Sequence, residues 1–259
     1  MDSIISPEGC GVGRESVLMN GQCFRWYANY TQQQDIQFGR SAKPGEVPNG
    51  YYIDKSDITV YPGIQSIQQL PRGYSVDQLY AYPDYMSGKE VNSDIGLIKL
   101  KQWIPLSTTT SHTLFRPINA ICLPSNSRNS SNDRYSGKSV IINQLALVAG
   151  FGAYDNDGHI AVDRLHMGWV YLVNNNNNND DLNYYVTRYP RYNGTVICSG
   201  DSGGPLYQYI NGRAVLIGIA QGTDKPYTTC LDPNDNNNIM SFVRILPHLD
   251  WITNIVSNN

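Results

Sequence analysis

The chain has 259 residues, a formal net charge of −3 and 16% charged residues, against about 25% in a typical globular protein. This charge balance gives no reason to expect nucleic acid or an anionic membrane surface as a partner. The sequence has no apolar run long enough to span a bilayer, which excludes a transmembrane helix.

Short apolar segments separated by turn residues fill the first half of the chain. Turn residues occur at Tyr61-Pro-Gly63, and the apolar segment Asn92-Ser-Asp-Ile-Gly-Leu-Ile-Lys-Leu100 follows later. Short apolar runs bounded by Gly, Pro, Asn and Asp predict β-strands. Taken alone, Asp94 would be interpreted as the cap of a buried strand.

The second half continues this pattern and ends in the one clear helix. Turn residues recur at Asn156-Asp-Gly158 and Asn211-Gly212. The run from Asn174 to Asp181 has no apolar residue to anchor it, and it predicts a mobile surface loop. The C-terminal stretch is predicted to be helical because its apolar residues fall on one face. These residues are Leu246, Leu249, Ile252, Ile255 and Val256.

The most specific motif in the chain is Cys198-Ser-Gly-Asp-Ser-Gly-Gly-Pro205. Its small residues let the backbone turn tightly around Ser202, and the N–H groups of Gly200 and Ser202 can converge on one point to hold an oxyanion. The motif resembles the nucleophile loop of the trypsin-like serine proteases. The resemblance implies that Ser202 is the nucleophile and that Asp94 is the aspartate of the catalytic triad.

Other segments resemble the same family in the same order along the chain. They are Ile121-Cys-Leu-Pro124, Val148-Ala-Gly-Phe-Gly152 and the closing helix with Trp251-Ile252. The resemblance implies one all-β unit over residues 1–259, with two packed six-stranded Greek-key-type barrels at 1–115 and 116–259 and a C-terminal α-helix. Because the chain begins near the family's second strand, we expect the first barrel to lack its N-terminal strand and to have an open edge.

The histidine of the triad has no counterpart in the expected place. The segment Ser16-Val-Leu-Met-Asn-Gly-Gln-Cys-Phe24 is similar to the family's histidine segment and puts Gln22 at the histidine position. A carboxamide has no basic lone pair near neutral pH, so Gln22 could hydrogen-bond Ser202 but could not activate it. The four histidines all follow Asp94, and we expect them to be solvated or capping residues. They are His112, His159, His166 and His248.

The aspartate before the nucleophile, Asp201, is expected to lack its usual partner. In the family this aspartate pairs with a new terminal ammonium after cleavage before an Ile-Val-Gly-Gly-like sequence, and this chain has no such sequence. A carboxylate is costly to bury alone. We therefore expect Asp201 either to stay outward in a zymogen-like loop or to be neutralised by another group.

The substrate pocket is also expected to differ from that of trypsin. The resemblance places Val196 at the pocket floor, so the aspartate that selects Lys or Arg is absent. Met240 falls where a pocket-wall glycine is expected. A valine floor alone favours apolar substrate side chains, whereas Met240 favours a filled pocket. The segment that would run along the substrate consists of Gln221, Gly222 and Thr223.

The chain has five cysteines, which the resemblance divides into two pairs and one odd residue. It pairs Cys10 with Cys23 and Cys198 with Cys230, and it leaves Cys122 odd. In many family members the equivalent of Cys122 bonds a segment that precedes the catalytic domain. We therefore expect a protein partner or a missing N-terminal segment, with Cys122 as a candidate link.

Two disulfides favour an oxidising, extracellular location. Asn-x-Ser/Thr sequons agree with this location, and they lie at Asn29, Asn129 and Asn193. The first residues contain no basic segment followed by an apolar run, so no signal peptide is predicted. We expect either that part of the full-length protein is missing from this sequence or that the chain is a truncated product with reduced cysteines.

Three functions remain open at this point. The first is a non-catalytic serine protease homologue that binds proteins as an adaptor, a decoy or an assembly component. The second is an active serine endopeptidase with an unrecognised base and a non-tryptic, apolar-leaning specificity, and the third is a fragment with no independent role. The 19 tyrosines suit a protein interface, although half-buried strand residues would explain them as well. No metal-ligand spacing stands out, so we expect no metal and no cofactor.

Overall fold

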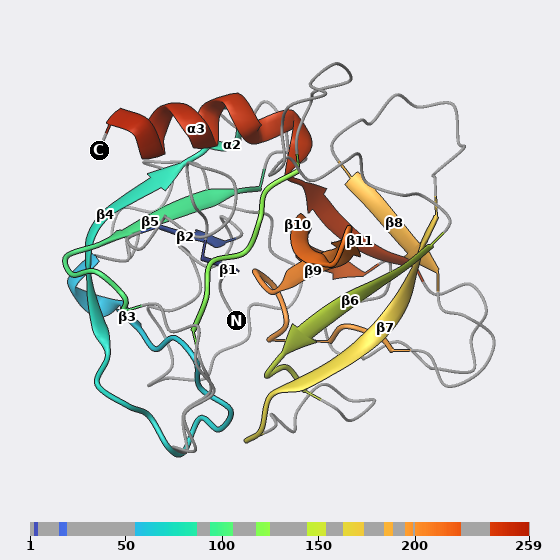
Figure 1. Cartoon of the computed structure of the whole chain (residues 1–259), viewed down its shortest axis with the longest axis horizontal. Helices are drawn as coiled ribbons and strands as arrows, with labels where there is room; N and C mark the ends of the chain where they lie inside the picture. The colour runs from blue at the N-terminus through green and yellow to red at the C-terminus, as the bar shows by residue number, and fades with distance from the viewer. Residues whose placement is uncertain are drawn as a thin grey trace, which may run out of the picture.

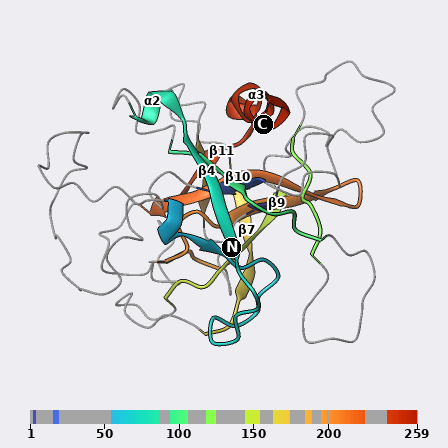
Figure 2. The ribbon, with the colours of Figure 1, turned by 90° about the vertical axis from the view of Figure 1, so that its left-hand side faces the viewer.

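The computed structural model describes residues 3–4, 16–19, 55–86, 94–105, 118–124, 144–153, 163–173, 184–188, 195–198, 200–223 and 239–258. Two groups of antiparallel strands lie side by side, and the C-terminal helix α3 runs across the top of the first group (Figure 1). Viewed from the side of the first group, β4 lies in front and α3 is seen end-on above it (Figure 2). The prediction of an all-β fold with a closing helix is confirmed.

The first group is a five-stranded sheet in the order β1-β2-β5-β4-β3. Its strands are β1 (Ser3–Ile4), β2 (Ser16–Met19), β3 (Thr59–Val60), β4 (Tyr74–Ala81) and β5 (Gly96–Leu100). The apolar run in β5 is buried on both faces. Ile98 and Leu100 pack with Val60 and Val76 on one face of the sheet. Leu97 faces the opposite way, towards α3 and the second group. Burial on both faces explains why this strand is almost continuously apolar.

The second group is a closed barrel in the order β10-β11-β8-β7-β6-β9. Its strands are β6 (Gln144–Gly150), β7 (His166–Val173), β8 (Tyr184–Arg188), β9 (Pro205–Ile210), β10 (Arg213–Thr223) and β11 (Ile239–Arg244). The inward side chains form one core that includes Val148, Val170, Leu206 and Phe242. The six-stranded barrel expected for the second half is therefore present.

The C-terminal segment joins the two halves. It begins as the 3₁₀ turn Leu246–His248 and continues as the helix α3 (Leu249–Asn258), and Pro247 suits the first turn because it has no N–H to leave unpaired. Ile252 of α3 is 1% exposed and belongs to a cluster with Leu97 of β5 and Val243 of β11. No helix in the described ranges has both the length and the apolar character needed to cross a membrane.

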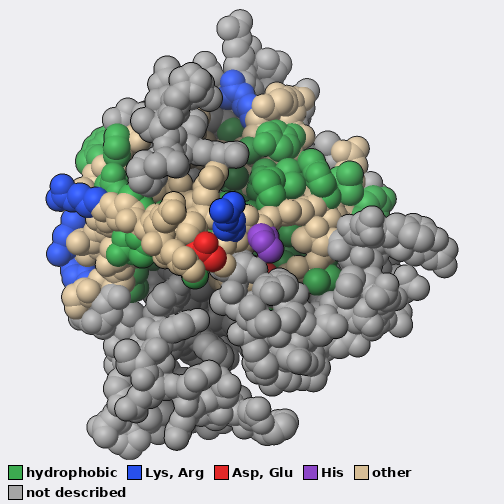
Figure 3. Space-filling view, turned by 90° about the horizontal axis from the view of Figure 1, so that it is seen from below, with side chains coloured by type: hydrophobic (Ala, Val, Ile, Leu, Met, Phe, Trp, Pro, Cys, Tyr) green, Lys and Arg blue, Asp and Glu red, His purple; other side chains and the backbone are tan. Residues whose placement is uncertain are grey.

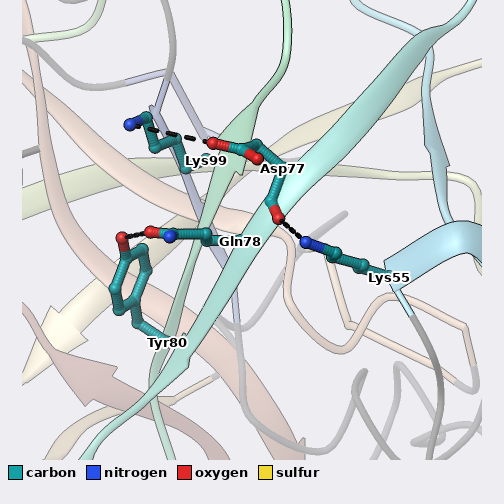
Figure 4. Close-up of polar contacts among 5 residues, drawn as sticks. All are labelled: Lys55, Asp77, Gln78, Tyr80 and Lys99. Atoms are coloured by element: carbon teal, nitrogen blue, oxygen red, sulfur yellow. Dashed lines mark hydrogen bonds and ion pairs between the residues drawn. The ribbon is translucent and has the colours of Figure 1, made fainter.

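Polar side chains on and beside β4 make several contacts, some within the strand and some with neighbouring elements (Figure 4). Lys55, in the 3₁₀ turn Lys55–Asp57, donates to the carbonyl oxygen of Asp77 at 2.6 Å, and Lys99 Nζ lies 3.8 Å from Asp77 Oδ2. The Tyr80 hydroxyl donates to Gln78 Oε1, and burial followed by the nearby Asp77 raises the pKa of Tyr80. Exposed contacts of this kind contribute little to stability.

The loop at Ser66–Gln68 in the first half contacts Asp163, which lies in the segment that precedes β7. Ile67 N–H donates to the Asp163 carbonyl at 2.9 Å, and the Ser66 hydroxyl donates to Asp163 Oδ1 at 2.7 Å. The same carboxylate oxygen accepts from Gln68 N–H at 3.2 Å. Asp163 therefore connects the two halves through both its backbone and its side chain.

We expect Asp163→Ala to lower the free energy of unfolding by about 1–2 kcal/mol, because Ser66 and Gln68 both lose an ionised acceptor. Urea denaturation measures this change. The matched control is Asp77→Ala, which removes an exposed carboxylate and should cost less than about 0.5 kcal/mol. Equal losses in the two variants would contradict a special role for the contact between the halves.

Candidate active site

Ser202 lies at the tip of a tight loop that is anchored to β10. The loop contains two glycines with positive φ, Gly200 at 93° and Gly203 at 85°, a conformation that side chains with a Cβ rarely adopt. Gly203 N–H donates to the Ala220 carbonyl at 2.8 Å, and Ala220 N–H donates to the Gly204 carbonyl at 2.8 Å. These two bonds hold the exposed Ser202 beside β10.

A β-bulge in β10 brings Gln221 to the nucleophile. The register between β10 and β11 shifts between Ala220 and Gly222, so Gln221 is the extra residue. Bulges of this kind redirect backbone groups beside functional sites. The Ser202 hydroxyl donates to the Gln221 carbonyl at 3.3 Å, so the structure brings together these two residues of the predicted site.

The Asp201 carboxylate points into the protein. Its Oδ1 accepts from Gly152 N–H at 2.8 Å, and its Oδ2 accepts from Cys198 N–H at 2.9 Å. The outward, zymogen-like arrangement considered from the sequence is therefore not the one adopted. Both carboxylate oxygens have backbone donors, and these donors connect the end of β6 to the nucleophile loop.

Two glycines make room for this carboxylate. A Cβ on Gly150 would lie 1.9 Å from Asp201 Oδ1, and a Cβ on Gly152 would lie 2.5 Å from Asp201 Cγ. Any larger residue at either position would displace the side chain of Asp201. In the sequence, the Gly150-Phe-Gly152 segment indicated only the family resemblance, and the role of its glycines beside Asp201 was not predicted. The spacing of the two glycines was the available signal.

Burial raises the pKa of the Asp201 carboxyl above its ordinary value. The backbone N–H groups of Cys198 and Gly152 act in the opposite direction, because they stabilise the ionised form. The net direction is upward, so the desolvation of the carboxylate outweighs its two hydrogen bonds. Asp201 at the base of the nucleophile loop is thus a carboxyl group whose ionised form is disfavoured by burial and favoured by two backbone donors.

Asp94, the predicted triad aspartate, lies two residues before the start of β5 and is 0% exposed. A carboxylate that is so deeply buried is typical of a residue with a structural or catalytic role, because carboxylates without such a role remain at the solvent-exposed surface. Gln22, which was predicted at the histidine position, lies outside the described residues. The proposed relation between Gln22, Asp94 and Ser202 therefore remains a prediction.

The residues predicted around the specificity pocket lie together. Met240 is 0% exposed and its sulfur accepts from Ile197 N–H at 3.3 Å. Thr223 lies opposite Met240 in the β10–β11 register, and Val196 packs against the same core cluster. In contrast, a Cβ on Gly222 would meet no atom of the described residues within 4 Å.

The two described histidines have different surroundings. His248 is 2% exposed, its Nδ1 lies 2.8 Å from the Arg244 carbonyl oxygen, and its ring contacts Tyr82 edge-on at 4.8 Å. It is therefore a packed residue beneath α3 rather than a solvated one. His166 is exposed, is the first residue of β7 and pairs with Gly150 of β6. His112 and His159 lie outside the described residues.

Cys122 and Cys198 are both disulfide-bonded. The expectation that Cys122 is odd is therefore wrong, because its sulfur is already bonded within this chain. Cys10, Cys23 and Cys230 lie outside the described residues. Because the chain has five cysteines, a bonded Cys122 is incompatible with the simultaneous presence of both expected pairs. The described ranges contain no group of three or more His, Cys, Asp or Glu side chains that could hold a metal ion.

The β-barrel fold and the Ser202 loop define a trypsin-like serine protease domain. The family model described as Trypsin matches residues 48–252, which is well over half of the sequence, so the chain belongs to the trypsin family.

Curated relatives match over shorter stretches. Chymotrypsin-like elastase family member 1 of Felis catus is 31% identical over 62 residues, which are 24% of this chain and 21% of that protein. The protein of the same name from Canis lupus familiaris is also 31% identical over 62 residues, 24% of this chain and 22% of its own length. Kallikrein-1E2 of Equus caballus is 39% identical over 64 residues, 24% of this chain and 20% of that protein. The matched part spans about a fifth of the length of these relatives.

We expect Gly150→Ala to lower the free energy of unfolding by about 2–4 kcal/mol, because the new methyl group displaces the Asp201 carboxylate from its donors. Chemical denaturation measures this loss. Gly222→Ala is the matched control, since its methyl group would meet no atom of the described residues, and it should change stability by less than about 1 kcal/mol. A Gly150→Ala variant as stable as the control would contradict the close packing against Asp201.

The raised pKa of Asp201 predicts a pH dependence that can be isolated by comparison with Asp201→Asn. A carboxyl whose pKa rises on folding contributes its full stability below its unfolded pKa, about 4, and loses that contribution as the pH increases through its folded pKa. The stability of the wild type relative to the variant should therefore fall over the pH range above about 4, the unfolded value, as the pH increases towards the raised folded pKa. Urea denaturation across this range provides the test. A relative stability that grows with pH would show that the hydrogen bonds outweigh burial.

Proposed function

We propose that this chain is a catalytically inactive trypsin-like serine protease homologue that acts by binding proteins, as an adaptor, a decoy or an assembly component. The observation that carries the proposal is the position of Met240, which is fully buried with its sulfur against Ile197 N–H. By the family resemblance this is where a substrate side chain would enter. A thioether in that place leaves no room for the group that anchors a substrate.

The predicted histidine position supports the same proposal. Gln22 occupies it in the sequence, and an amide can neither accept the Ser202 proton nor return it to a leaving amine. The loss of one triad member lowers turnover by on the order of a million-fold. The proposed defects in the base and in the pocket are independent of each other.

The second candidate function is an active serine endopeptidase with an unrecognised base and an apolar-leaning specificity. The observation in its favour is the well-formed nucleophile loop, in which Asp201 lies inward and Ser202 is exposed. Such a loop is also compatible with binding alone, because its conformation is maintained by backbone hydrogen bonds and glycines rather than by a catalytic base.

We further propose an extracellular location and a division of the chain into barrels near residue 115. Disulfide bonds at Cys122 and Cys198 suit an oxidising compartment. The described strands of the first sheet end at Leu100 and those of the closed barrel begin at Gln144, which is compatible with this boundary. Because Cys122 is already bonded, we do not assign it as a link to another chain.

A fluorophosphonate probe on the purified chain, compared with Ser202→Ala, tests the proposed inactivity. The probe requires an activated serine and an oxyanion hole but little substrate specificity. We expect no labelling that depends on Ser202. Rapid labelling that is lost in Ser202→Ala would establish the active endopeptidase instead.

Gln22→His extends the same experiment, with Gln22→Asn as the matched control. We expect neither variant to gain substantial peptidase activity, because Met240 still fills the pocket position. Strong activity from Gln22→His alone would show that the pocket is functional and that the base is the single defect.

A further inference from the structure

His166, the first residue of β7, lies directly opposite Gly150 of β6 in the strand register. Val170 and Leu172, at alternate positions from His166, belong to the barrel core. Because alternate residues of a strand share one face of the sheet, the His166 side chain starts from the face that lines the inside of the barrel. It is nevertheless exposed at the strand end. Seen from below, the surface carries one histidine beside basic, acidic and hydrophobic side chains (Figure 3).

The Asp201 carboxylate reaches the same end of the β6–β7 pair from the nucleophile loop. A Cβ on Gly150 would lie 1.9 Å from Asp201 Oδ1, so the carboxylate occupies the space of the missing side chain. Directly opposite residues of an antiparallel pair carry their Cβ atoms on one face, about 5 Å apart. Asp201 Oδ1 therefore lies within roughly 7 Å of the His166 Cβ. An exposed imidazole and an inward carboxylate are thus neighbours on one face of the sheet.

The charge of the imidazole acts on this carboxyl. Burial raises the pKa of Asp201, and four groups lower it. They are the N–H donors of Cys198 and Gly152, the N-terminal ammonium of the chain and His166. The two cations act by Coulombic attraction, which favours the ionised carboxylate. Of these four groups, His166 is the one side chain.

Uncharged residues of other segments contact the Asp201 carboxylate or pair with His166. They are Gly150, Gly152 and the disulfide-bonded Cys198. Two charged residues directly precede Leu165 and His166 in the chain. Asp163 accepts hydrogen bonds from the loop of the first half, and Arg164 forms an isolated β-bridge with Ser66. Neither of them is among the groups that shift the pKa of Asp201.

The exposure of His166 makes this attraction sensitive to the pH of the solution. Histidine is the side chain whose charge ordinarily changes between about pH 5 and pH 8. The exposed ring of His166 can exchange protons with solvent directly, whereas Asp201 is held inward by backbone donors. The attraction requires an ionised carboxylate and a protonated imidazole together. It is therefore absent at low pH, where the carboxyl is neutral, and above about pH 8, where the imidazole is neutral.

We propose that His166 is a positioning residue for the nucleophile loop, whose protonated ring stabilises the inward Asp201 carboxylate and whose deprotonation makes the loop less stable. The loop around Ser202 is thus held most firmly in mildly acidic to neutral solution. This inference goes beyond the proposed function, because it concerns the conformation of the loop and is independent of whether Ser202 reacts. Fluorophosphonate labelling and the experiment below can therefore fail separately.

Urea denaturation of the wild type and His166→Gln, at about pH 6 and about pH 9, tests the proposal. We expect the unfolding equilibrium constant of His166→Gln to exceed that of the wild type about two- to fivefold at the lower pH, the range of exposed ion pairs. The two proteins should have equal constants at the higher pH, where the wild-type imidazole is neutral. Because both proteins have the same N-terminus, the contribution of the terminal ammonium is common to them.

His166→Lys separates the charge from the shape of the side chain. Lysine keeps its positive charge at both pH values, so this variant should match the wild type at about pH 6. At about pH 9 it should unfold with a constant about two- to fivefold smaller than that of the wild type. In an Asp201→Asn background, His166→Gln should have no effect at either pH, because the carboxylate that it acts on is gone.

Met167→Gln is the matched control, because Met167 is the next residue, is 61% exposed and points to the opposite face of the sheet. It should shift stability equally at both pH values, and circular dichroism should show all variants folded. An effect of His166→Gln that is absent at about pH 6, or equal at the two pH values, would overturn the proposal. So would a His166→Lys variant that behaves like His166→Gln at about pH 6, and this comparison does not require Asp201→Asn to fold.

Discussion

The buried Asp201 carboxylate is the interaction on which the site depends. It joins the end of β6, through Gly152 N–H, to the start of the nucleophile loop, through Cys198 N–H. Gly150 and Gly152 must lack side chains for this contact to exist. Burial disfavours the ionised carboxylate more than these two hydrogen bonds favour it, so the pKa of Asp201 is raised while the same two bonds connect the loop to β6. The exposed Ser202 depends on this balance.

A second constraint positions the two halves of the chain. β5 is buried on both faces, with Ile98 inside the first sheet and Leu97 in the cluster shared with α3 and the barrel. Ile252 of α3 completes that cluster, and Asp163 connects the halves at a second point. The buried Asp94 is next to Ile95 of the same cluster, so its backbone is positioned by the packing that joins the sheet to the barrel.

Side chains alternate in direction along each barrel strand, so one strand contributes to both the barrel core and the outer surface. In β6, Val148 faces the core, Leu147 faces outward, and Gly150 at the strand end abuts Asp201. Outward positions of β6 are thus separated from the nucleophile loop by the barrel core. The buried Met240, whose sulfur accepts from Ile197 N–H, lies on the core side of the same barrel.

Local patterns in the sequence were sufficient to predict the strands, the closing helix and the tight loop around Ser202. These features depend on short-range periodicity, turn residues and small residues. The inward position of Asp201, the contact between Met240 and Ile197 N–H, and the disulfide-bonded state of Cys122 could not be obtained in this way. Each of them depends on which distant segments become neighbours. The outer surface of the barrel has the same origin, since Tyr209, Leu145 and Trp169 become neighbours only after β9, β6 and β7 pair. Strand pairing and barrel closure are long-range events, and only the tertiary structure determines them.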